Sequence, residues 1–481
     1  MRICMIAEGC YPYVVGGVSS WIHSMIKSFP QYDFVILSIV ANRSMRGKFV
    51  YELPENVKEV YEVYLDDVDW NEKHKKKDLH LDKEEYAALR SLMLNQRVDW
   101  DTLFRMFHQE QLSVNQVLMG PDFLGIATEL YDKKYPEIVY SDFLWTLRSI
   151  YLPLFLCMES DIPKADVYHC IATGYAGILG SMAVSLYGGG LLLSEHGIYT
   201  REREEELIKA KWVKGVFKDI WIEQFRKMSL LVYQRADIVT ALFEHARDLQ
   251  IELGCPQGKT MITPNGVNTQ KFAGIPGKKE EDKGMINVGA VLRIAPIKDV
   301  KTLIHAFGQA KQKVKNLKLW LMGPANEEQE YAAECHKLID ELGIEDIIFT
   351  GSIDVTQYLG RMDFLILTSI SEGQPLTVLE GFAAHKPSIT TDVGSCRELL
   401  YGGTGDAFGP AGILTHIMNT EEIADAIVTL AQSPDLVKEY GENGYRRVMA
   451  YYKIEYMQQK YGEIYGSLEE KYVKDKKEGE K

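Results

Sequence analysis

The sequence predicts an α/β protein with two doubly wound, Rossmann-like domains that face each other across a cleft. The chain has 481 residues, about three times the length of a typical domain. In both halves, short apolar runs alternate with amphipathic segments of helix length, and glycine-bearing turns separate them. Such runs are typical of parallel strands that helices cover on both faces.

The first half, residues 1–263, is predicted to form an N-terminal domain. Strands are expected over residues 2–7, 34–40, 167–172, 191–194 and 238–242, and a helix is expected from Gly16-Gly17 to residue 29. The stretch 171–194 contains no charged residue, but Gly188, Gly189 and Gly190 interrupt it. We therefore expect a helix over 174–187, a turn and a buried strand there, and no membrane-spanning helix.

Residues 42–136 are charged and mostly helical in period, which indicates an insertion on the first domain. They include a run of charges at 72–77 that is expected to be solvated.

The second half, residues 264–436, repeats the pattern and is predicted to be a C-terminal domain. Strands are expected over 286–291, 317–322, 347–350, 364–368, 388–391 and 412–414, with helices over 300–313, 327–342, 376–385 and 420–432. The turn Pro264-Asn265-Gly266 and the polar run 277–284 are expected to link the halves. A Tyr-rich helix over 440–465, in a segment 437–468, is expected to cross back to the first domain, and 469–481 forms a charged tail.

Composition excludes several classes of function. The 54 Lys and Arg against 68 Asp and Glu give a net charge of −14, which argues against broad binding to nucleic acid or anionic lipid. The seven cysteines are scattered without a Cys-x-x-Cys pair, which predicts free thiols in a reducing compartment. The N-terminus lacks the basic region of a signal peptide, so we expect a cytoplasmic protein.

The most informative motif is the segment 371–381, Ser-Glu-Gly-Gln-Pro-Leu-Thr-Val-Leu-Glu-Gly, which follows a predicted strand and begins a helix. Pro375 suits the first helical turn, and the N–H groups and dipole of that turn favour an anion. Glu372 is expected in the loop, and Glu380 on one helix stripe with Thr377. Carboxylates accept paired hydrogen bonds from sugar diols. The alternative is a plain helix start with a solvated glutamate.

A second motif, residues 291–299, follows another predicted strand. Arg293 and Lys298 are expected at its carboxyl end, where doubly wound sheets bind ligands. An arginine fork and a lysine charge suit a diphosphate, and they would offset the charge of a leaving diphosphate. Exposed lysines and arginines are common, so ordinary surface residues are the alternative.

The third motif, residues 8–18, places Gly16 and Gly17 after the first strand. Glycines let backbone approach a phosphate and begin a helix, although the spacing is that of neither a dinucleotide loop nor a Walker loop. The alternative is a tight turn.

The fourth motif, residues 194–203, places His196 at the end of a buried strand of the first domain. A lone histidine is more often a satisfied structural residue, and that is the alternative here, but a position at a strand end supports a functional role. The polar residues after it are candidates for holding an acceptor.

Metal signals are weak. The Asp-x-Asp pairs at 67–69 and 99–101 lie inside the charged insertion, where we expect solvated surface, and no His-x-x-x-His pair occurs. We therefore expect no metal and no cofactor.

These four motifs, in this order, resemble the retaining glycosyltransferases of family 4, which have the GT-B architecture. Glu372 and Glu380 match the Glu-x7-Glu motif of that family, and Arg293 and Lys298 match the basic pair that precedes it. The resemblance spans nearly the whole chain outside the insertion. The run 195–203 and the insertion are further similar to the PelF-type members, which belong to operons for Pel-like exopolysaccharide and biofilm formation.

The resemblance implies a role for each residue. Arg293 and Lys298 would bind the diphosphate of a UDP-sugar, Glu372 the hexose hydroxyls, Glu380 the ribose, and His196 would lie near the transferred sugar. Further contacts with the donor are implied for Gly16, Gly17, Gly373, Gln374, Leu376 and Thr377. Many family members have Glu-Gly-Phe-Gly-Leu-Pro here, whereas this chain places Pro375 three residues after Glu372, which predicts a shifted helix start.

The implied activity is metal-independent, retaining transfer of a hexose or N-acetylhexosamine from a UDP-sugar to a growing exopolysaccharide. The first domain would bind the acceptor and the second the donor, and an inner-membrane synthase complex is the implied partner. Glucose, N-acetylglucosamine and N-acetylgalactosamine stay open as the sugar. Two alternatives are a UDP-sugar epimerase of the same fold and a non-catalytic subunit that senses nucleotides.

Overall fold

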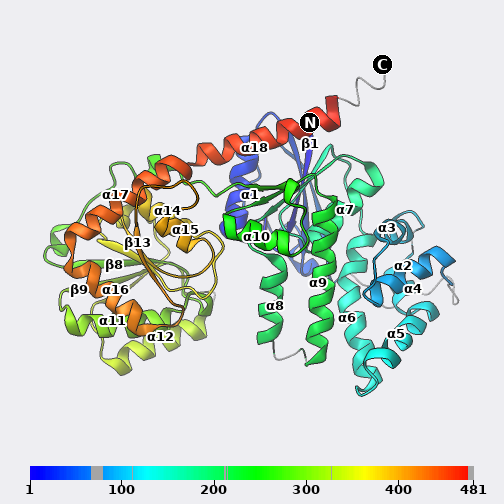
Figure 1. The fold of residues 1–481 in the computed structure, drawn as a ribbon, viewed down its shortest axis with the longest axis horizontal. Coiled ribbons are helices and arrows are strands. Elements are labelled where there is room, and N and C mark those ends of the chain that lie inside the picture. Colours follow the sequence, from blue (N-terminus) through cyan, green and yellow to red (C-terminus); the bar gives the residue numbers. More distant parts are fainter. Residues whose placement is uncertain (67–79, 111, 211–212, 214, 327, 475–481) are drawn as a thin grey trace. The chain divides into compact units, whose positions relative to one another are not determined.

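The computed structural model describes residues 1–66, 80–110, 112–210, 213, 215–326 and 328–474. The chain divides into two compact units, each with one parallel sheet (Figure 1). Unit 1 comprises Met1–Ala241, Arg247–Met261 and Gly462–Lys481, and unit 2 comprises Leu242–Ala246 and Ile262–Tyr461.

The sheet of unit 1 has seven strands in the order β3-β2-β1-β4-β5-β6-β7. They are β1 (Arg2–Glu8), β2 (Asp33–Val40), β3 (Val57–Tyr64), β4 (Val167–Cys170), β5 (Gly190–Glu195), β6 (Ile238–Ala241) and β7 (Thr260–Ile262). The pairs of β1 with β2 and with β4 are parallel, and the chain order reverses between β1 and β4. Ligands bind doubly wound sheets at such a point, beyond the carboxyl ends of the strands.

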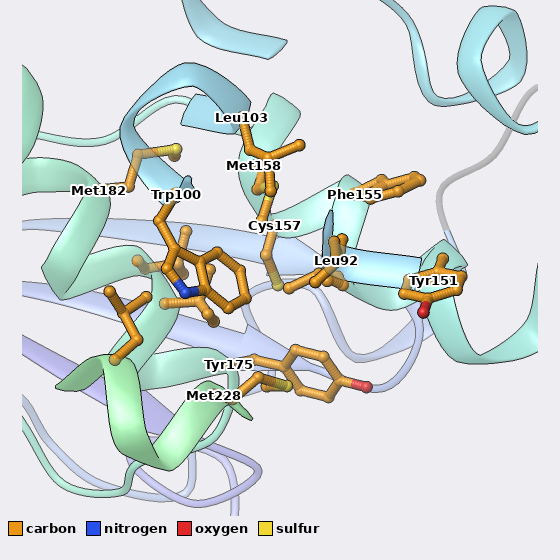
Figure 2. Close-up of a cluster of buried hydrophobic side chains, with 14 of the residues drawn as sticks. Leu92, Trp100, Leu103, Tyr151, Phe155, Cys157, Met158, Tyr175, Met182 and Met228 are labelled. Carbon is orange, nitrogen blue, oxygen red and sulfur yellow. The ribbon is translucent and has the colours of Figure 1, made fainter. Parts of the chain in front are cut away.

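Helices of unit 1 bury a large apolar core against this sheet. They are α1 (Gly17–Ser28), α2 (Lys83–Met93), α3 (Trp100–His108), α4 (Val114–Leu118), α5 (Pro121–Lys134), α6 (Tyr140–Glu159), α7 (Tyr175–Tyr187), α8 (Tyr199–Lys209) and α9 (Val216–Arg235), and α10 (Glu244–Glu252) follows β6. Figure 2 shows Trp100 of α3, Phe155 of α6 and Met228 of α9 in this core. The helices of the insertion therefore share the core of the unit and are not an appended module.

The sheet of unit 2 has six strands in the order β10-β9-β8-β11-β12-β13. They are β8 (Ile286–Val291), β9 (Leu317–Met322), β10 (Ile347–Gly351), β11 (Phe364–Leu367), β12 (Ser388–Thr391) and β13 (Gly412–Thr415). This is the doubly wound order of a dinucleotide-binding sheet, and its reversal lies between β8 and β11, which pair in parallel.

Alternate side chains of these strands enter two cores, one on each face of the sheet. Leu319 and Leu321 of β9 join one core with α11 and α16, whereas Trp320 and Met322 join the other with α14 and α17. Helices of unit 2 are α11 (Val300–Lys313), α12 (Gln329–Leu342), α13 (Thr356–Leu359), α14 (Leu376–Ala383), α15 (Cys396–Tyr401), α16 (Thr420–Gln432) and α17 (Pro434–Tyr451).

The structure corrects the expectation of one helix over 440–465. Two helices stand there, α17 and α18 (Ile454–Glu469), with a break at Tyr452 and Lys453. The backbone of Val267 donates to Tyr452 O over 2.8 Å and accepts from Ile454 N over 3.0 Å, so a strand-like pairing replaces the helical hydrogen bonds at this point.

Four further expectations are corrected. Residues 57–64, assigned to a mostly helical insertion, form β3, and residues 260–262 form the unpredicted strand β7. The run 277–284 is more than a polar linker, because it contains the buried Asp282, whose carboxylate accepts two hydrogen bonds from Arg361 at 2.8 and 3.0 Å. Pro375 is the residue that precedes α14 and does not lie in its first turn.

Other expectations are confirmed. The stretch 171–194 forms α7, a glycine turn and the buried strand β5, and no helix among the described residues is long and apolar enough to cross a bilayer. All seven cysteines are free thiols. The charged run 72–77 and the pair 67–69 lie outside the described residues. Of the charged tail, Lys471 and Tyr472 bind Asp237 at 2.6 and 2.7 Å.

Candidate functional site

The loops that follow β8 and β11 lie at the reversal point of the unit 2 sheet. The first carries Arg293 and Lys298 before α11, and the second carries Glu372 before α14. Because β8 and β11 are neighbours, residues 74 positions apart in the chain come into contact: Lys298 Nζ lies 2.5 Å from Glu372 Oε1. The sheet order thus brings together two of the predicted site residues, while Arg293 is exposed at the end of β8.

The ion pair of Lys298 and Glu372 is accessible to a ligand, since their side chains are 19% and 13% exposed. Ser369 Oγ also donates to Glu372 Oε1, at 2.5 Å. Among the described residues, both hydrogen bonds to this carboxylate engage Oε1, which leaves Oε2 to face a ligand. The carboxylate can therefore accept a hydroxyl while the ammonium attracts an anion.

Backbone hydrogen bonds hold these two loops to one another. Ile370 N donates to Ile297 O at 2.9 Å, and Thr368 Oγ1 donates to Lys298 O at 3.0 Å. On the other side, Ser395 N donates to Gly373 O at 2.9 Å. Groups held in this way keep their geometry when a ligand binds, which is the requirement for electrostatic stabilisation.

Gly394 is a residue that sequence reasoning missed. Its φ is +53°, and a Cβ there would lie 2.2 Å from Gly373 O, so only glycine allows this approach. The sequence indicated this residue only as a glycine that follows the predicted strand 388–391 closely.

The helix α14 begins at this site without a side-chain cap and without an acidic residue in its first turn. Its N-terminal N–H groups therefore favour an anion. Thr377 and Glu380 lie on one stripe of this helix. Burial raises the pKa of the Glu380 carboxyl to about 7, and the ammonium of Lys271 opposes that shift.

Gln374 is buried, and its side chain, rather than its backbone, forms the hydrogen bond that holds this loop. Its Oε1 accepts a hydrogen bond from Asn265 N at 2.7 Å. Within the described part of the chain its Nε2 is buried without a partner. The Pro-Asn-Gly turn, which the sequence suggested as a linker, thus fixes the loop that carries Glu372.

In unit 1, Gly16 and Gly17 follow β1 and begin α1. Their backbone does not require glycine, because Gly16 is extended, and a Cβ at either position would meet no atom within 4 Å. Neighbouring Val14 and Val15 are 49% and 69% exposed. The glycines therefore leave open space rather than relieve strain, which fits a loop that a ligand approaches closely.

His196 follows β5, which lies two strands from β1 in the sheet, at the same edge. Its ring packs edge-on against Trp21 of α1, with 4.5 Å between ring centroids. Burial lowers the pKa of His196 to about 4, so the ring is neutral near pH 7. Its Nε2 is buried and has no hydrogen-bond partner among the described residues. Such a group is available to a hydroxyl of a bound molecule.

Two carboxyl groups that the sequence analysis did not single out lie at the same strand ends. Glu8 Oε1 accepts from Tyr199 OH at 2.9 Å, and burial raises its pKa. Glu195 is buried, its Oε2 accepts from Tyr233 OH at 2.7 Å and from Gln250 Nε2 at 3.0 Å, and burial raises its pKa to about 7.

The described residues contain no cluster of three or more His, Cys, Asp or Glu able to hold a metal. Asp99 accepts from Thr102 N at 3.2 Å as the cap of α3, and Asp101 pairs with Arg235 at 2.7 Å. This Asp-x-Asp pair therefore has structural partners.

Comparison with known families and structures assigns the chain to a family. Residues 1–258 match the family described as "Domain of unknown function (DUF3492)". The chain belongs to this family. Residues 283–433 match "Glycosyl transferases group 1", so this DUF3492 protein carries a group 1 glycosyltransferase domain.

Two relatives of the DUF3492 protein are sugar-transferring enzymes by name. An MMP alpha-(1->4)-mannosyltransferase of Mycolicibacterium hassiacum is 24% identical over 59% of this chain and 66% of its own length. The putative glycosyltransferase EpsD of Bacillus subtilis is 25% identical over 60% of this chain and 74% of its own length.

Solved structures show the fold. Anabaena HepE in complex with UDP and glucose has a TM-score of 0.60 and 16% identity, covering 97% of this chain and all of that one. Sucrose-phosphate synthase from Thermosynechococcus elongatus has a TM-score of 0.61 and 15% identity, covering 97% and 98%. The DUF3492 protein therefore has the GT-B architecture. Its match to the group 1 glycosyl transferases over residues 283–433 is what indicates a glycosyltransferase of that type.

Proposed function

We propose that the protein transfers a hexosyl or N-acetylhexosaminyl group from a UDP-sugar, with retention and without a metal, to a growing polysaccharide. The observation that carries the proposal is the pairing of Lys298 with Glu372 beside the uncapped start of α14 at the reversal point of a doubly wound sheet. A cation and a helix N-terminus suit a diphosphate, and the neighbouring carboxylate suits a sugar. HepE, of the same fold, binds UDP and UDP-glucose.

In this mechanism the protein stabilises charge and provides no nucleophile. Arg293, Lys298 and the first N–H groups of α14 offset the negative charge on the leaving diphosphate. Glu372 accepts hydrogen bonds from the sugar hydroxyls, and Glu380 from the ribose. The glycosidic bond breaks through an oxocarbenium-like transition state, and the leaving phosphate oxygen takes the acceptor's proton on the same face. His196 is neutral and contacts a hydroxyl of the transferred sugar.

We infer that the acceptor is a growing exopolysaccharide and that a membrane synthase complex is the partner; the resemblance to PelF-type proteins supports both. A panel of nucleotide sugars tests the donor class, because a ligand that binds the native state raises the melting temperature. UDP-sugars are expected to stabilise the protein more than GDP-sugars. NMR of the product's anomeric proton then reports retention, and an epimerised UDP-sugar formed without acceptor would favour the epimerase instead.

Turnover is expected to survive EDTA, because Arg293, Lys298 and a helix N-terminus supply the positive charge that a divalent ion supplies elsewhere. The assay measures UDP release with and without an excess of chelator. If the chelator abolished turnover and manganese restored it, the proposal of a metal-independent reaction would be contradicted. The Asp-x-Asp pair at 67–69 would then be the candidate metal site.

The exchange Gly17→Val is expected to reduce transfer at least tenfold while leaving the fold intact. A Cβ at residue 17 would have open space around it, so the melting temperature should stay within about 2 °C of the wild type. The matched control is Gly125→Val, at another helical glycine with open space around it. If Gly17→Val and Gly125→Val were equally active, close approach of a ligand to this loop would be wrong.

A further inference from the structure

A cavity of about 660 Å³ lies in unit 1, and none of Gly16, Gly17 and His196 lines it. Its walls are the segment 96–101, where α3 begins, and the C-terminal half of α9. A volume of this size is in the range of small-molecule sites. Trp100, which closes one side, also packs into the core of the unit (Figure 2).

One end of the cavity lies at the edge of the sheet opposite His196. Helix α9 leads into the amino end of β6, so its last turn, with Gln234 and Arg235, lies at the edge where strands begin. Asp101 of the cavity wall contacts Ser185 near the end of α7, which leads into the amino end of β5. His196 follows the carboxyl end of β5, so the cavity is no part of the site at that end.

The cavity wall carries three cationic side chains, Arg97, Lys227 and Arg235, beside two acidic and two amide side chains. Lys227 Nζ donates to Leu92 O at 2.7 Å, its one hydrogen bond within the described part of the chain, so two of its three donors remain. Burial lowers the pKa of Lys227 to about 8, with Glu223 opposing and Lys134 adding to that shift. Arg97 is exposed and forms no ion pair with a described residue.

The acidic groups of the cavity already have partners. Asp101 is paired with Arg235 at 2.7 Å, and Asp99 caps α3 through Thr102. Lys227 and Arg97 therefore supply positive charge that no carboxylate in the wall offsets, in a chain whose net charge is −14.

We propose that this cavity is a second ligand site, which binds a small molecule that carries a phosphate or diphosphate group on a partly apolar body. Lys227 and Arg97 bind the phosphate oxygens, and the amides of Gln96 and Gln234 donate further hydrogen bonds. Trp100 and Leu230, which is 39% exposed, contact the apolar part. Ser229 of the same helix contacts Thr173 at 2.7 Å, at the carboxyl end of β4, so α9 touches both edges of the sheet.

Calorimetric titration of the full chain with sodium pyrophosphate tests this site. Pyrophosphate is also expected to bind at Lys298, so the titration uses the double variant Arg293→Ala/Lys298→Ala. We expect one saturable site to remain there. Adding Lys227→Met, which keeps the length of the side chain and removes its charge, should weaken that binding at least tenfold, and adding Arg97→Ala at least threefold.

Two further variants separate a lost ligand site from a damaged fold. Leu230→Trp fills the cavity without removing a charge and should also weaken binding at least tenfold. Lys83→Met removes an exposed lysine of the same insertion and should leave binding unchanged. The proposal is overturned if the double variant binds no pyrophosphate, or if neither Lys227→Met nor Leu230→Trp weakens the binding. If Arg293→Ala/Lys298→Ala bound pyrophosphate in the same way as the wild type, the result would instead count against the proposed donor site.

Discussion

Replacing Lys298 with alanine is expected to lower kcat/KM for transfer by about 10²–10³, or about 2.7–4 kcal/mol of transition-state stabilisation. The ammonium lies 2.5 Å from Glu372, at the point where the diphosphate is proposed to leave, and the negative charge there is greatest in the transition state. The loss should therefore appear mainly in kcat. Initial rates of UDP release from the UDP-sugar that the panel selects give both constants.

Lys301→Ala is the matched control for this experiment. Lys301 lies three residues further on, in α11, and pairs with the exposed Glu334 at 2.6 Å. An exposed pair contributes little to stability, so this variant should keep full activity and a wild-type melting curve. Lys298→Ala should also stay folded, because its partner is not in the apolar core. Full activity of a folded Lys298→Ala protein would exclude the proposed donor site.

Glu380→Gln is expected to make the protein more stable at pH 8 while weakening UDP binding at least tenfold. Burial raises the pKa of this carboxyl to about 7, whereas in the unfolded chain it ionises near pH 4.5. Below pH 4.5 it is protonated in both states, and as the pH rises to 7 the unfolded chain loses its proton first. Wild-type stability therefore falls across that range, by at most about 3 kcal/mol.

Urea unfolding of both proteins between pH 4.5 and 8 measures this difference. The free energies of unfolding should agree at pH 4.5, and the variant should be the more stable one at pH 8. The exposed Glu345→Gln serves as control, with no pH-dependent gain. In parallel, UDP affinity of the wild type should rise from pH 6 to 8, because the ionised carboxylate accepts the ribose hydroxyls, and the variant should lack this rise. If Glu380→Gln and the wild type bound UDP with equal affinity, the proposed contact between Glu380 and the ribose would be wrong.

The second half of the chain was the more predictable one. The strands Ile286–Val291 and Leu317–Met322 and the helix Val300–Lys313 have the expected bounds. Both strands are largely buried on two faces, so apolar residues dominate their sequences, INVGAV and LKLWLM. The position of Lys298 and Glu372 at one sheet edge also followed, since the carboxyl ends of parallel strands share an edge.

Elements that depend on distant partners were missed. The strand Val57–Tyr64 lies at the sheet edge, where only one side pairs, and its charged, half-exposed sequence gives no apolar run. The break between α17 and α18 is set by Val267, almost 190 residues earlier, and no local signal such as proline marks it.

The candidate site was likewise predicted only in part from the sequence. Lys298 and Glu372 were named because they follow predicted strands at the edge where doubly wound sheets bind ligands, and Glu380 because it lies on the helix that begins there. The hydrogen bonds of Ser369 with Glu372 and of Gln374 with Asn265, and the close approach of Gly394 to Gly373, are tertiary contacts that residue type alone does not specify. The raised pKa of Glu380 likewise comes from burial by the folded chain.

A crystal structure of the protein with UDP tests the central claim most directly. We expect the diphosphate within hydrogen-bond distance of Lys298 Nζ, Arg293 and the first N–H groups of α14, with the ribose hydroxyls on Glu380 and the contact between Lys298 and Glu372 loosened. Well-defined UDP bound at another place, with Lys298 still paired to Glu372 and Arg293 directed to solvent, would contradict the account.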